Sequence, residues 1–143
     1  MLSKWDIRML ELANFVAGWS KDPSTRVGAV IADSQYRIVS TGFNGFPRGV
    51  QDKLDVSRET KLLRTIHAED NAILFARRDL TGANIYVSRP PCANCAARII
   101  QAGIWKVAYS TPDAGFLERW AGAIAEAEAM LDEAGVVVLR AEM

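Results

Sequence analysis

Apolar side chains recur at helical spacing near the start of the chain. The recurring residues are Trp5, Met9, Leu12, Phe15, Val16 and Trp19. A stripe of this kind predicts a helix over residues 4–19 with one buried face, and we interpret its aromatic members as core residues. A polar, turn-forming stretch follows at residues 20–25.

Two short apolar runs come next, with a polar turn between them. They span residues 27–32 and 37–41, and Asp33-Ser34-Gln35 separates them. So short a connection favours two antiparallel strands. Residues 42–49 contain three glycines and a proline, which predicts a shaped loop rather than a regular element.

The rest of the chain alternates between short apolar runs and helical patterns. Residues 50–66 are polar and suggest only a solvated helix from about residue 57. The predicted helices span 67–78, 92–102 and 116–133, and the predicted strands span 85–87, 106–110 and 136–139. This order predicts a three-layer α/β/α sandwich around a five-stranded mixed sheet. A helical crossover lets the last two strands run parallel.

Length and charge limit the class of protein. A chain of 143 residues predicts a single domain over residues 1–143. Seventeen basic and seventeen acidic residues give a formal net charge of zero, which argues against a nucleic-acid partner because such proteins usually carry a basic excess. No apolar run reaches the roughly 18 residues of a membrane helix, so no membrane partner is expected. The absence of a signal-peptide pattern and a lone CxxC pair predict a cytoplasmic location.

The only histidine and the only two cysteines lie in two short motifs, His67-Ala68-Glu69 and Pro91-Cys92-Ala93-Asn94-Cys95. A CxxC pair by itself also fits a redox motif, and a lone histidine also fits a core position. Together they supply three ligands, the number of a catalytic zinc site, whereas a structural site has four. The combined pattern is typical of zinc-dependent nucleobase deaminases. We therefore predict one zinc on His67, Cys92 and Cys95, and no second structural zinc.

The spacing of these residues suits that chemistry. Cys92 and Cys95 are three positions apart and share a face of a helix. Pro91 suits the start of that helix, where the positive potential stabilises thiolates. Glu69 is not needed as a ligand, so we assign it proton transfer as a general acid and base. The alternative is that Glu69 only complements the helix dipole.

Several stretches together resemble the deoxycytidylate (dCMP) deaminases of the cytidine deaminase superfamily, in their bacteriophage or bacterial form. The stretches are residues 20–31, 42–49, 67–73, 91–96 and 99–104. The resemblance implies the cytidine deaminase fold and zinc-dependent hydrolysis of dCMP to dUMP plus ammonia, a step toward dTMP. For a viral protein the location would be the host cytoplasm. For a phage enzyme, a 5-modified dCMP is a further candidate substrate.

The resemblance also implies roles around the substrate. The substrate-binding candidates are Asn44, Ala68, Lys21, Arg26 and Pro91. Asn44 would recognise the sugar, the backbone at Ala68 would contact the base, and Lys21 and Arg26 would lie near the 5′-phosphate. On local grounds Asn44 could equally stabilise its own turn, and basic residues at loop tips are often only solvated.

A further set of residues concerns regulation. Gly42-Phe43-Asn44-Gly45 resembles the family's Gly-Tyr-Asn-Gly effector loop, with Phe in place of Tyr. Family members are often homo-oligomers, commonly hexamers, activated by dCTP and inhibited by dTTP. The missing hydroxyl leaves open whether this chain keeps that regulation. The effector or phosphate candidates are Gly42, Phe43, Gly45, Arg48 and Arg64.

Two other functions fit parts of the pattern. A tRNA adenosine deaminase, or another nucleic-acid or nucleoside deaminase of the same fold, shares both zinc motifs. The stretches at residues 20–26 and 42–49 and the zero net charge favour a mononucleotide instead. A binding module or zinc-stabilised scaffold without activity is disfavoured by Glu69, because a scaffold has no chemical need for an acid beside the metal.

Overall fold

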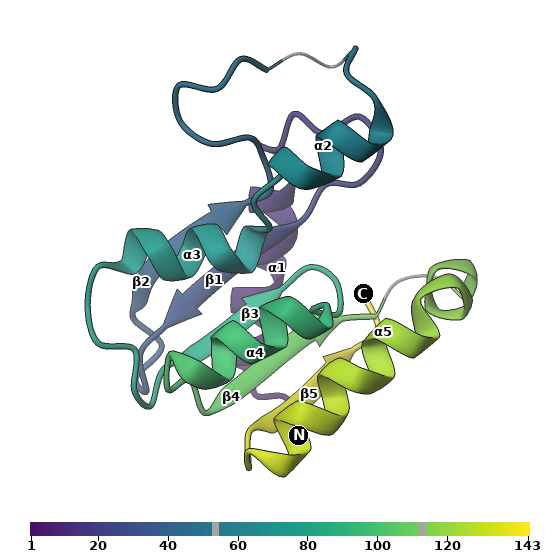
Figure 1. The fold of residues 1–143 in the computed structure, drawn as a ribbon. Helices are drawn as coiled ribbons and strands as arrows, with labels where there is room; N and C mark the ends of the chain where they lie inside the picture. Colours follow the sequence, from purple (N-terminus) through teal and green to yellow (C-terminus); the bar gives the residue numbers. More distant parts are fainter. Residues whose placement is uncertain (53–54, 112–113) are drawn as a thin grey trace.

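A five-stranded sheet forms the middle layer of the molecule (Figure 1). The computed structural model describes residues 1–52, 55–111 and 114–143. Its strands are β1 (Gly28–Ala32), β2 (Ile38–Phe43), β3 (Asn84–Val87), β4 (Lys106–Ser110) and β5 (Val137–Ala141). Across the sheet they follow the order β2-β1-β3-β4-β5. β1 runs antiparallel to β2 and β3, and β4 runs parallel to β3 and β5. The predicted mixed sheet, with its last two strands parallel, is confirmed.

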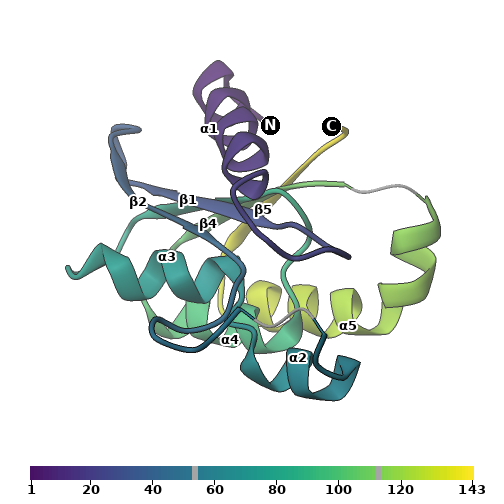
Figure 2. The same ribbon diagram turned by 90° about the horizontal axis from the view of Figure 1, so that it is seen from above.

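Helices cover both faces of this sheet. Helix α1 (Lys4–Ala17) lies on one face, and α3 (Ala68–Ala76), α4 (Ala93–Gln101) and α5 (Ala114–Glu133) lie on the other, as Figure 2 shows. Side chains of successive strand residues point to opposite faces. Thus Ala29 and Ile31 of β1 belong to the core under α3, α4 and α5, whereas Val30 and Ala32 pack toward α1. The predicted three-layer sandwich is confirmed.

The sequence prediction for the first helix is partly wrong. The helix ends at Ala17, and Trp5, Phe15 and Trp19 are 42%, 66% and 51% exposed rather than buried. The face that packs on the sheet is formed by smaller residues, among them Leu10 and Ala13, which are fully buried. The physical reason is that the apolar stripe is wider than the face that the sheet can cover.

A buried ion pair fastens α1 to the sheet. Lys106 Nζ lies 2.8 Å from Asp6 Oδ1, and the two side chains are 9% and 2% exposed. The Tyr86 hydroxyl donates to the same carboxylate oxygen at 2.7 Å. Burial raises the pKa of Asp6, but hydrogen bonds from Lys106, the Ser3 backbone and Tyr86 lower it more, so its net pKa lies below its ordinary value.

A glycine lets α3 approach the sheet closely. A β-carbon on Gly42 would lie 2.4 Å from the carbonyl oxygen of Ala68 and 2.5 Å from the backbone nitrogen of Ala72. The register pairs Gly42 with Ala29 and Phe43 with Gly28. The prediction of a loop from residue 42 is therefore wrong for these two positions, because pairing with β1 extends the strand. The first turn of α3 is held directly against β2.

The remaining elements follow the predicted order with shifted ends. Helix α2 (Arg58–Arg64) occupies the polar segment and stands beyond the sheet, near the start of α3 (Figure 1). Helix α3 ends at Ala76, and its C-cap residue Arg77 adopts the left-handed conformation with a φ of 51°. Over the parts of the chain that the structure describes, no helix is long and apolar enough to cross a membrane.

Candidate metal and catalytic site

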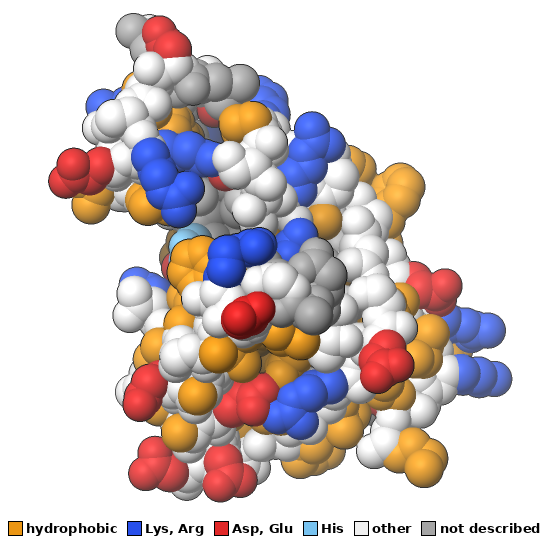
Figure 3. Space-filling model, turned by 90° about the vertical axis from the view of Figure 1, so that its right-hand side faces the viewer, with side chains coloured by type: hydrophobic (Ala, Val, Ile, Leu, Met, Phe, Trp, Pro, Cys, Tyr) orange, Lys and Arg blue, Asp and Glu red, His pale blue; other side chains and the backbone are white. Residues whose placement is uncertain are grey.

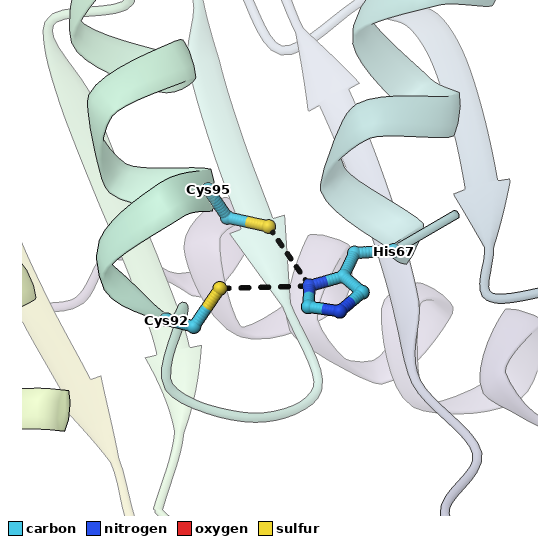
Figure 4. Close-up of side chains that lie close together, drawn as sticks. All are labelled: His67, Cys92 and Cys95. Carbon is cyan, nitrogen blue, oxygen red and sulfur yellow. Dashed lines mark hydrogen bonds between the residues drawn. The ribbon is translucent and has the colours of Figure 1, made fainter. Parts of the chain in front are cut away.

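The first turns of α3 and α4 bring the only histidine and both cysteines together, as Figure 4 shows. His67 Nδ1 lies 3.2 Å from Cys95 Sγ and 3.5 Å from Cys92 Sγ. His67 and Cys92 are the N-cap residues of their helices, and neither side chain bonds to its own helix backbone. Both side chains point instead into the space between the two helix ends.

This group fits a tetrahedral zinc. Zn–N bonds of about 2.0–2.1 Å and Zn–S bonds of about 2.3 Å at tetrahedral angles place N and S about 3.6 Å apart. The observed separations of 3.2 and 3.5 Å are close to that value. His67 is exposed, Cys92 is half-buried and Cys95 is buried, so the group is open to solvent on one side. Three ligands and an open side are the arrangement of a catalytic zinc site rather than a structural one.

The two thiols differ in acidity. A hydrogen bond from Cys95, with a further contribution from His67, lowers the pKa of Cys92 to about 4. The interaction with Cys92, together with burial, raises the pKa of Cys95 well above its ordinary value. The hydrogen bond with Cys92 also raises the pKa of His67. A bound cation favours deprotonated ligands, so metal uptake at this group releases protons.

Glu69 lies in the first turn of α3, two residues after His67, and its side chain is only 4% exposed. Burial raises the pKa of its carboxyl group to about 7. A carboxyl group with a pKa near neutrality can both accept and release a proton at physiological pH, which suits general acid–base catalysis. Glu69 is therefore buried beside the metal-binding group without being needed as a ligand.

A cavity of ≈ 240 Å³ opens above His67, Glu69 and Cys92. Its walls come from the segment before β1, from α2, from the connection between β3 and α4, and from α5. Three of the predicted substrate-binding residues, Asn44, Ala68 and Pro91, line it. The structure thus gathers these three residues with His67, Cys92 and Glu69 around one space.

Asn44 has a clear structural role at this cavity. Its side-chain oxygen accepts from the backbone N–H of Val27 at 2.9 Å, and its side-chain nitrogen donates to the carbonyl of Thr25 at 2.9 Å. Thr25 and Val27 line the cavity as well. Asn44 therefore fixes one wall, and its predicted contact with a sugar stays a prediction.

The four basic residues predicted near a phosphate or effector do not line this cavity. They are Lys21, Arg26, Arg48 and Arg64. Lys21 forms an exposed ion pair with Asp52 at 2.8 Å, and the guanidinium of Arg48 lies 5.6 Å from the ring centre of Phe75. Their predicted roles are not supported by position in this cavity and stay predictions.

Among the residues that the structure describes, the basic ones that line the cavity are Arg58, Lys61 and Arg89, and the sequence argument missed all three as site residues. Two signals could have found them. Arg58 and Lys61 are three positions apart in the helical segment just before His67, and Arg89 precedes the Pro-Pro-Cys sequence. Neither signal belongs to a recognised motif, so only the fold makes their convergence visible.

A second cavity, of ≈ 250 Å³, lies beside the predicted effector loop. Phe43, Asn44 and Gly45 line it, as do Trp19 and Lys21. The rings of Phe43 and Trp19 meet edge to face at 6.3 Å. Gly42, the remaining residue of the loop, faces α3 and packs there.

Known proteins share these features. A family model described as "Cytidine and deoxycytidylate deaminase zinc-binding region" matches residues 3–111. An Aliivibrio fischeri protein described as an uncharacterized deaminase in the luxG 3′ region is 54% identical over 139 residues, covering 96% of this chain and 94% of the relative. A probable deoxycytidylate deaminase of Drosophila melanogaster is 41% identical over 118 residues, covering 73% of this chain but only 58% of the fly protein.

A solved structure is similar in fold. The dCMP deaminase of cyanophage S-TIM5, in complex with dCMP and dUMP, superposes with a TM-score of 0.81 at 23% identity over 99% of both chains. At this identity the likeness concerns the fold, which is the cytidine deaminase-like sandwich expected from the sequence.

Proposed function

Because the chain belongs to the cytidine and deoxycytidylate deaminase family, we propose that it hydrolyses dCMP to dUMP and ammonia, a step that supplies dTMP. One observation carries the proposal: His67, Cys92 and Cys95 converge beside the buried Glu69 at the base of one cavity. The relatives from fly and human that carry an activity in their names are deoxycytidylate deaminases. Water is the co-substrate, so the reaction consumes dCMP and water and yields dUMP and ammonia.

His67, Cys92 and Cys95 would hold one zinc ion. When bound, zinc would supply a Lewis acid that lowers the pKa of water and polarises the reacting group. The chain contributes the arrangement of its ligands: two N-cap side chains directed away from their own helices, and Cys95 one turn into α4. The position of Cys92 at a helix N-terminus favours its thiolate form, and a bound cation would favour the thiolate form of Cys95.

Glu69 would move the protons of the reaction. Glu69 lines the cavity and is held in the first turn of α3, which packs tightly against β2. Glu69 would accept the two protons of the attacking water in succession, and would deliver one to the ring nitrogen and the other to the amino group that leaves as ammonia. General acid–base catalysis of this kind is typically worth about 10² to 10⁴ in rate.

Asn44, Ala68 and Pro91 would position the nucleoside. The amide of Asn44 makes one hydrogen bond through each of its polar atoms to the chain. An amide can donate twice and accept twice, so one N–H and one lone pair remain for a sugar hydroxyl. The backbone at Ala68, next to Glu69, would contact the base, and Pro91 would border it.

The test is ammonia release by purified, zinc-loaded protein. The substrates are dCMP, CMP, deoxycytidine, dCTP and a tRNA anticodon stem. We expect turnover of dCMP well above that of the others. Turnover of the tRNA stem without turnover of dCMP would show a nucleic-acid deaminase of the same fold. Silence on every substrate with zinc bound would favour a binding module.

Regulation and assembly are proposed on the resemblance. We propose that dCTP and dTTP act at the cavity bordered by Phe43, Asn44 and Gly45, and that the chain forms a homo-oligomer, a hexamer in the form common among dCMP deaminases. Repeating the ammonia assay with each effector, and measuring the solution mass by light scattering, tests both. Acceptance of a 5-modified dCMP is tested in the same assay. A cytoplasmic location stays a prediction.

A further inference from the structure

We propose that the ion pair between Asp22 and Lys61 positions one wall of the cavity above His67. The pair holds α2 against the segment before β1 and so sets the width of the cavity. Asp22 and Lys61 would act through the walls that they join, and not on the reacting atoms. The kinetic consequence rests on the proposed deaminase function. The structural consequence, that α2 depends on this pair for its place, does not.

Helix α2 buries little of its own surface. It has seven residues, all of them described, and none is buried. Its two leucines, Leu62 and Leu63, are 60% and 82% exposed. An isolated helix shorter than about 12–15 residues is marginal in water, and most helices in proteins are stabilised by packing of an apolar face. The place of α2 therefore depends on polar contacts with the rest of the chain.

The ion pair of Lys61 supplies such a contact from the middle of α2. Its Nζ donates to Asp22 Oδ1 at 2.8 Å and to Ser24 Oγ at 3.3 Å. The side chains of Lys61 and Asp22 are 22% and 10% exposed. A β-bridge between Gly45 and Ile66 fixes the chain beyond the end of α2. The bridge therefore holds the following segment, and Lys61 fastens the helix itself.

The segment that carries Asp22 is fixed independently of α2. Asp22 Oδ1 also accepts from the backbone N–H groups of Ser24 and Thr25, at 2.8 and 3.0 Å. The side-chain nitrogen of Asn44 donates to the carbonyl of Thr25 at 2.9 Å, and the hydroxyl of Ser20 donates to the carbonyl of Asn44 at 2.8 Å. Asn44 directly follows β2, so these bonds tie the segment to the sheet. The pair thus joins the less supported wall to the better supported one.

The pair also lies between the two cavities. Asp22 and Lys61 line both of them, as do Asn44 and Thr65. Figure 3 shows the histidine in a hollow below the part of the molecule that carries α2 in Figure 1. Because a cavity borders the pair on each side, α2 has room to move once the pair is broken. Such a movement would change the width of this hollow.

Loss of the pair should weaken substrate binding and spare the chemical step. Helix α2 supplies Arg58, Lys61 and Leu62 to the cavity wall, whereas the metal-binding residues and Glu69 stand at the starts of α3 and α4. When the binding-competent arrangement is only partly populated, the apparent dissociation constant rises by the inverse of that fraction. A displaced α2 should therefore raise KM with kcat retained.

The test measures kcat and KM for dCMP in zinc-loaded Lys61→Met, Asp22→Asn and the double variant. Asparagine keeps an oxygen for the N–H groups of Ser24 and Thr25. We expect each single variant to raise KM by about 5- to 15-fold, between the values of an exposed ion pair and of a hydrogen bond to a charged group. Both kcat and the zinc content should stay within about twofold of the parent. The double variant should resemble each single variant, because all three lack the same interaction.

Two further variants complete the series. Lys61→Arg keeps the positive charge and should retain most of the parent's affinity for dCMP. Arg37→Met is the control, because it breaks another ion pair, that of Arg37 with Asp33 at 3.0 Å. Arg37 lies in the turn between β1 and β2 and does not line the cavity. Its loss should change neither kcat nor KM.

Opposite effects of the two single variants on KM would overturn the proposal. If Lys61 contacted the anionic substrate directly, Lys61→Met would raise KM, and Asp22→Asn, which releases the cation, would lower it. Additive losses in the double variant would also overturn the proposal, because they indicate two independent roles. An unchanged KM in both single variants would do the same, as would a fall in kcat as large as the rise in KM.

Hydrogen exchange of residues 57–66, followed by mass spectrometry without substrate, tests the structural consequence. We expect exchange in this segment to be about 5- to 15-fold faster in Lys61→Met and Asp22→Asn, because local opening no longer has to break the pair. Exchange in β3 and β4 should be unchanged. If the parent deaminates no nucleotide, the proposed function fails separately, and this measurement decides. Faster exchange then supports the role of the pair in holding α2, and unchanged exchange overturns it.

Discussion

Asp70 and Arg98 form an ion pair between the two helices that carry the metal-binding residues, with 3.4 Å between Oδ1 and Nε. Asp70 follows His67 by three positions on α3, and Arg98 follows Cys95 by three positions on α4. The pair therefore lies about one helical turn beyond the ligands. Among the described residues Asp70 Oδ1 has no hydrogen-bond partner, so the charge of Arg98 offsets the charge of that buried oxygen.

Arg98→Ala is expected to weaken zinc binding by up to about fivefold, since a partly exposed ion pair is worth about 0.2–1 kcal/mol. The loss of the pair loosens the spacing of α3 and α4, and with it the spacing of His67 from the cysteines. Competition with a chromophoric chelator measures the affinity. Arg98→Lys keeps the positive charge and should retain most of the zinc affinity. Arg140→Ala breaks the Arg140–Glu128 pair elsewhere and should leave the zinc affinity unchanged. An unaltered affinity in Arg98→Ala would refute the role.

Glu69→Gln should keep the fold and the zinc but lower turnover of dCMP by about 10² to 10⁴, because the amide cannot transfer protons. Elemental analysis checks the zinc content, and ammonia release checks the rate. Glu133→Gln, at an exposed position near the end of α5, is the control and should be fully active. Near-normal turnover in Glu69→Gln would end the assignment of Glu69 as the proton-transfer group.

Zinc should raise the thermal stability of the protein, because a ligand that binds only the folded state adds about 2.7 kcal/mol at 100 times its Kd. Differential scanning calorimetry with and without a chelator measures the shift. Cys92→Ser removes one ligand and should abolish most of the zinc-dependent shift. Asn94→Ala changes an exposed residue between the two cysteines and should retain it. A shift that survives in Cys92→Ser would argue against this metal site.

The Asp6–Lys106 pair predicts a pH dependence of stability. The folded-state pKa of Asp6 lies below the ordinary 3.8, so its contribution is fully present above that value and is lost as the pH falls through the lowered pKa. Asp6→Asn leaves Lys106 buried without its anion and should cost about 3–5 kcal/mol at pH 7. Urea unfolding at pH 3 to 7 measures the free energy of unfolding of Asp6→Asn and of the parent. The difference between the two should become smaller only below about pH 4.

The exposed Asp132→Asn is the control for that series and should follow the parent at every pH. If the difference in the free energy of unfolding between Asp6→Asn and the parent grew toward low pH, the pH dependence would have the opposite sign. That result would contradict a lowered pKa of Asp6 in the folded state.

Gly42→Ala should destabilise the protein by about 1–3 kcal/mol, because its β-carbon would press on the backbone of α3. It should also reduce turnover, since that turn of α3 holds Glu69. Gly45→Ala is the matched control three residues later, where a β-carbon meets nothing within 4 Å. Urea unfolding of both variants measures the contrast. Equal free energies of unfolding for Gly42→Ala and Gly45→Ala would show that α3 can move away from β2 without loss of stability.

Local sequence was sufficient for most of the fold. Alternation between short apolar runs and helical stripes predicted the order of the elements, and the crossover rule predicted the parallel pair β4 and β5. The predictions of burial and of strand ends failed where the packing of a neighbouring element decides them. Phe15 and Trp19 match the helical stripe but stay exposed because the sheet covers only the face of Leu10 and Ala13. The local sequence predicts a loop at Gly42, but pairing with β1 makes Gly42 part of a strand.

The sequence alone predicted the chemistry of the site, because one histidine, two cysteines and a glutamate at this spacing leave few alternatives for a metal and a proton-transfer group. It did not reveal which cations surround them. Arg58 and Arg89 lie 31 positions apart in the chain and line one cavity only because α2 and the β3–α4 connection form facing walls. Ligand identity is encoded in local spacing, whereas the electrostatic field of a cavity depends on segments that only the tertiary structure brings together.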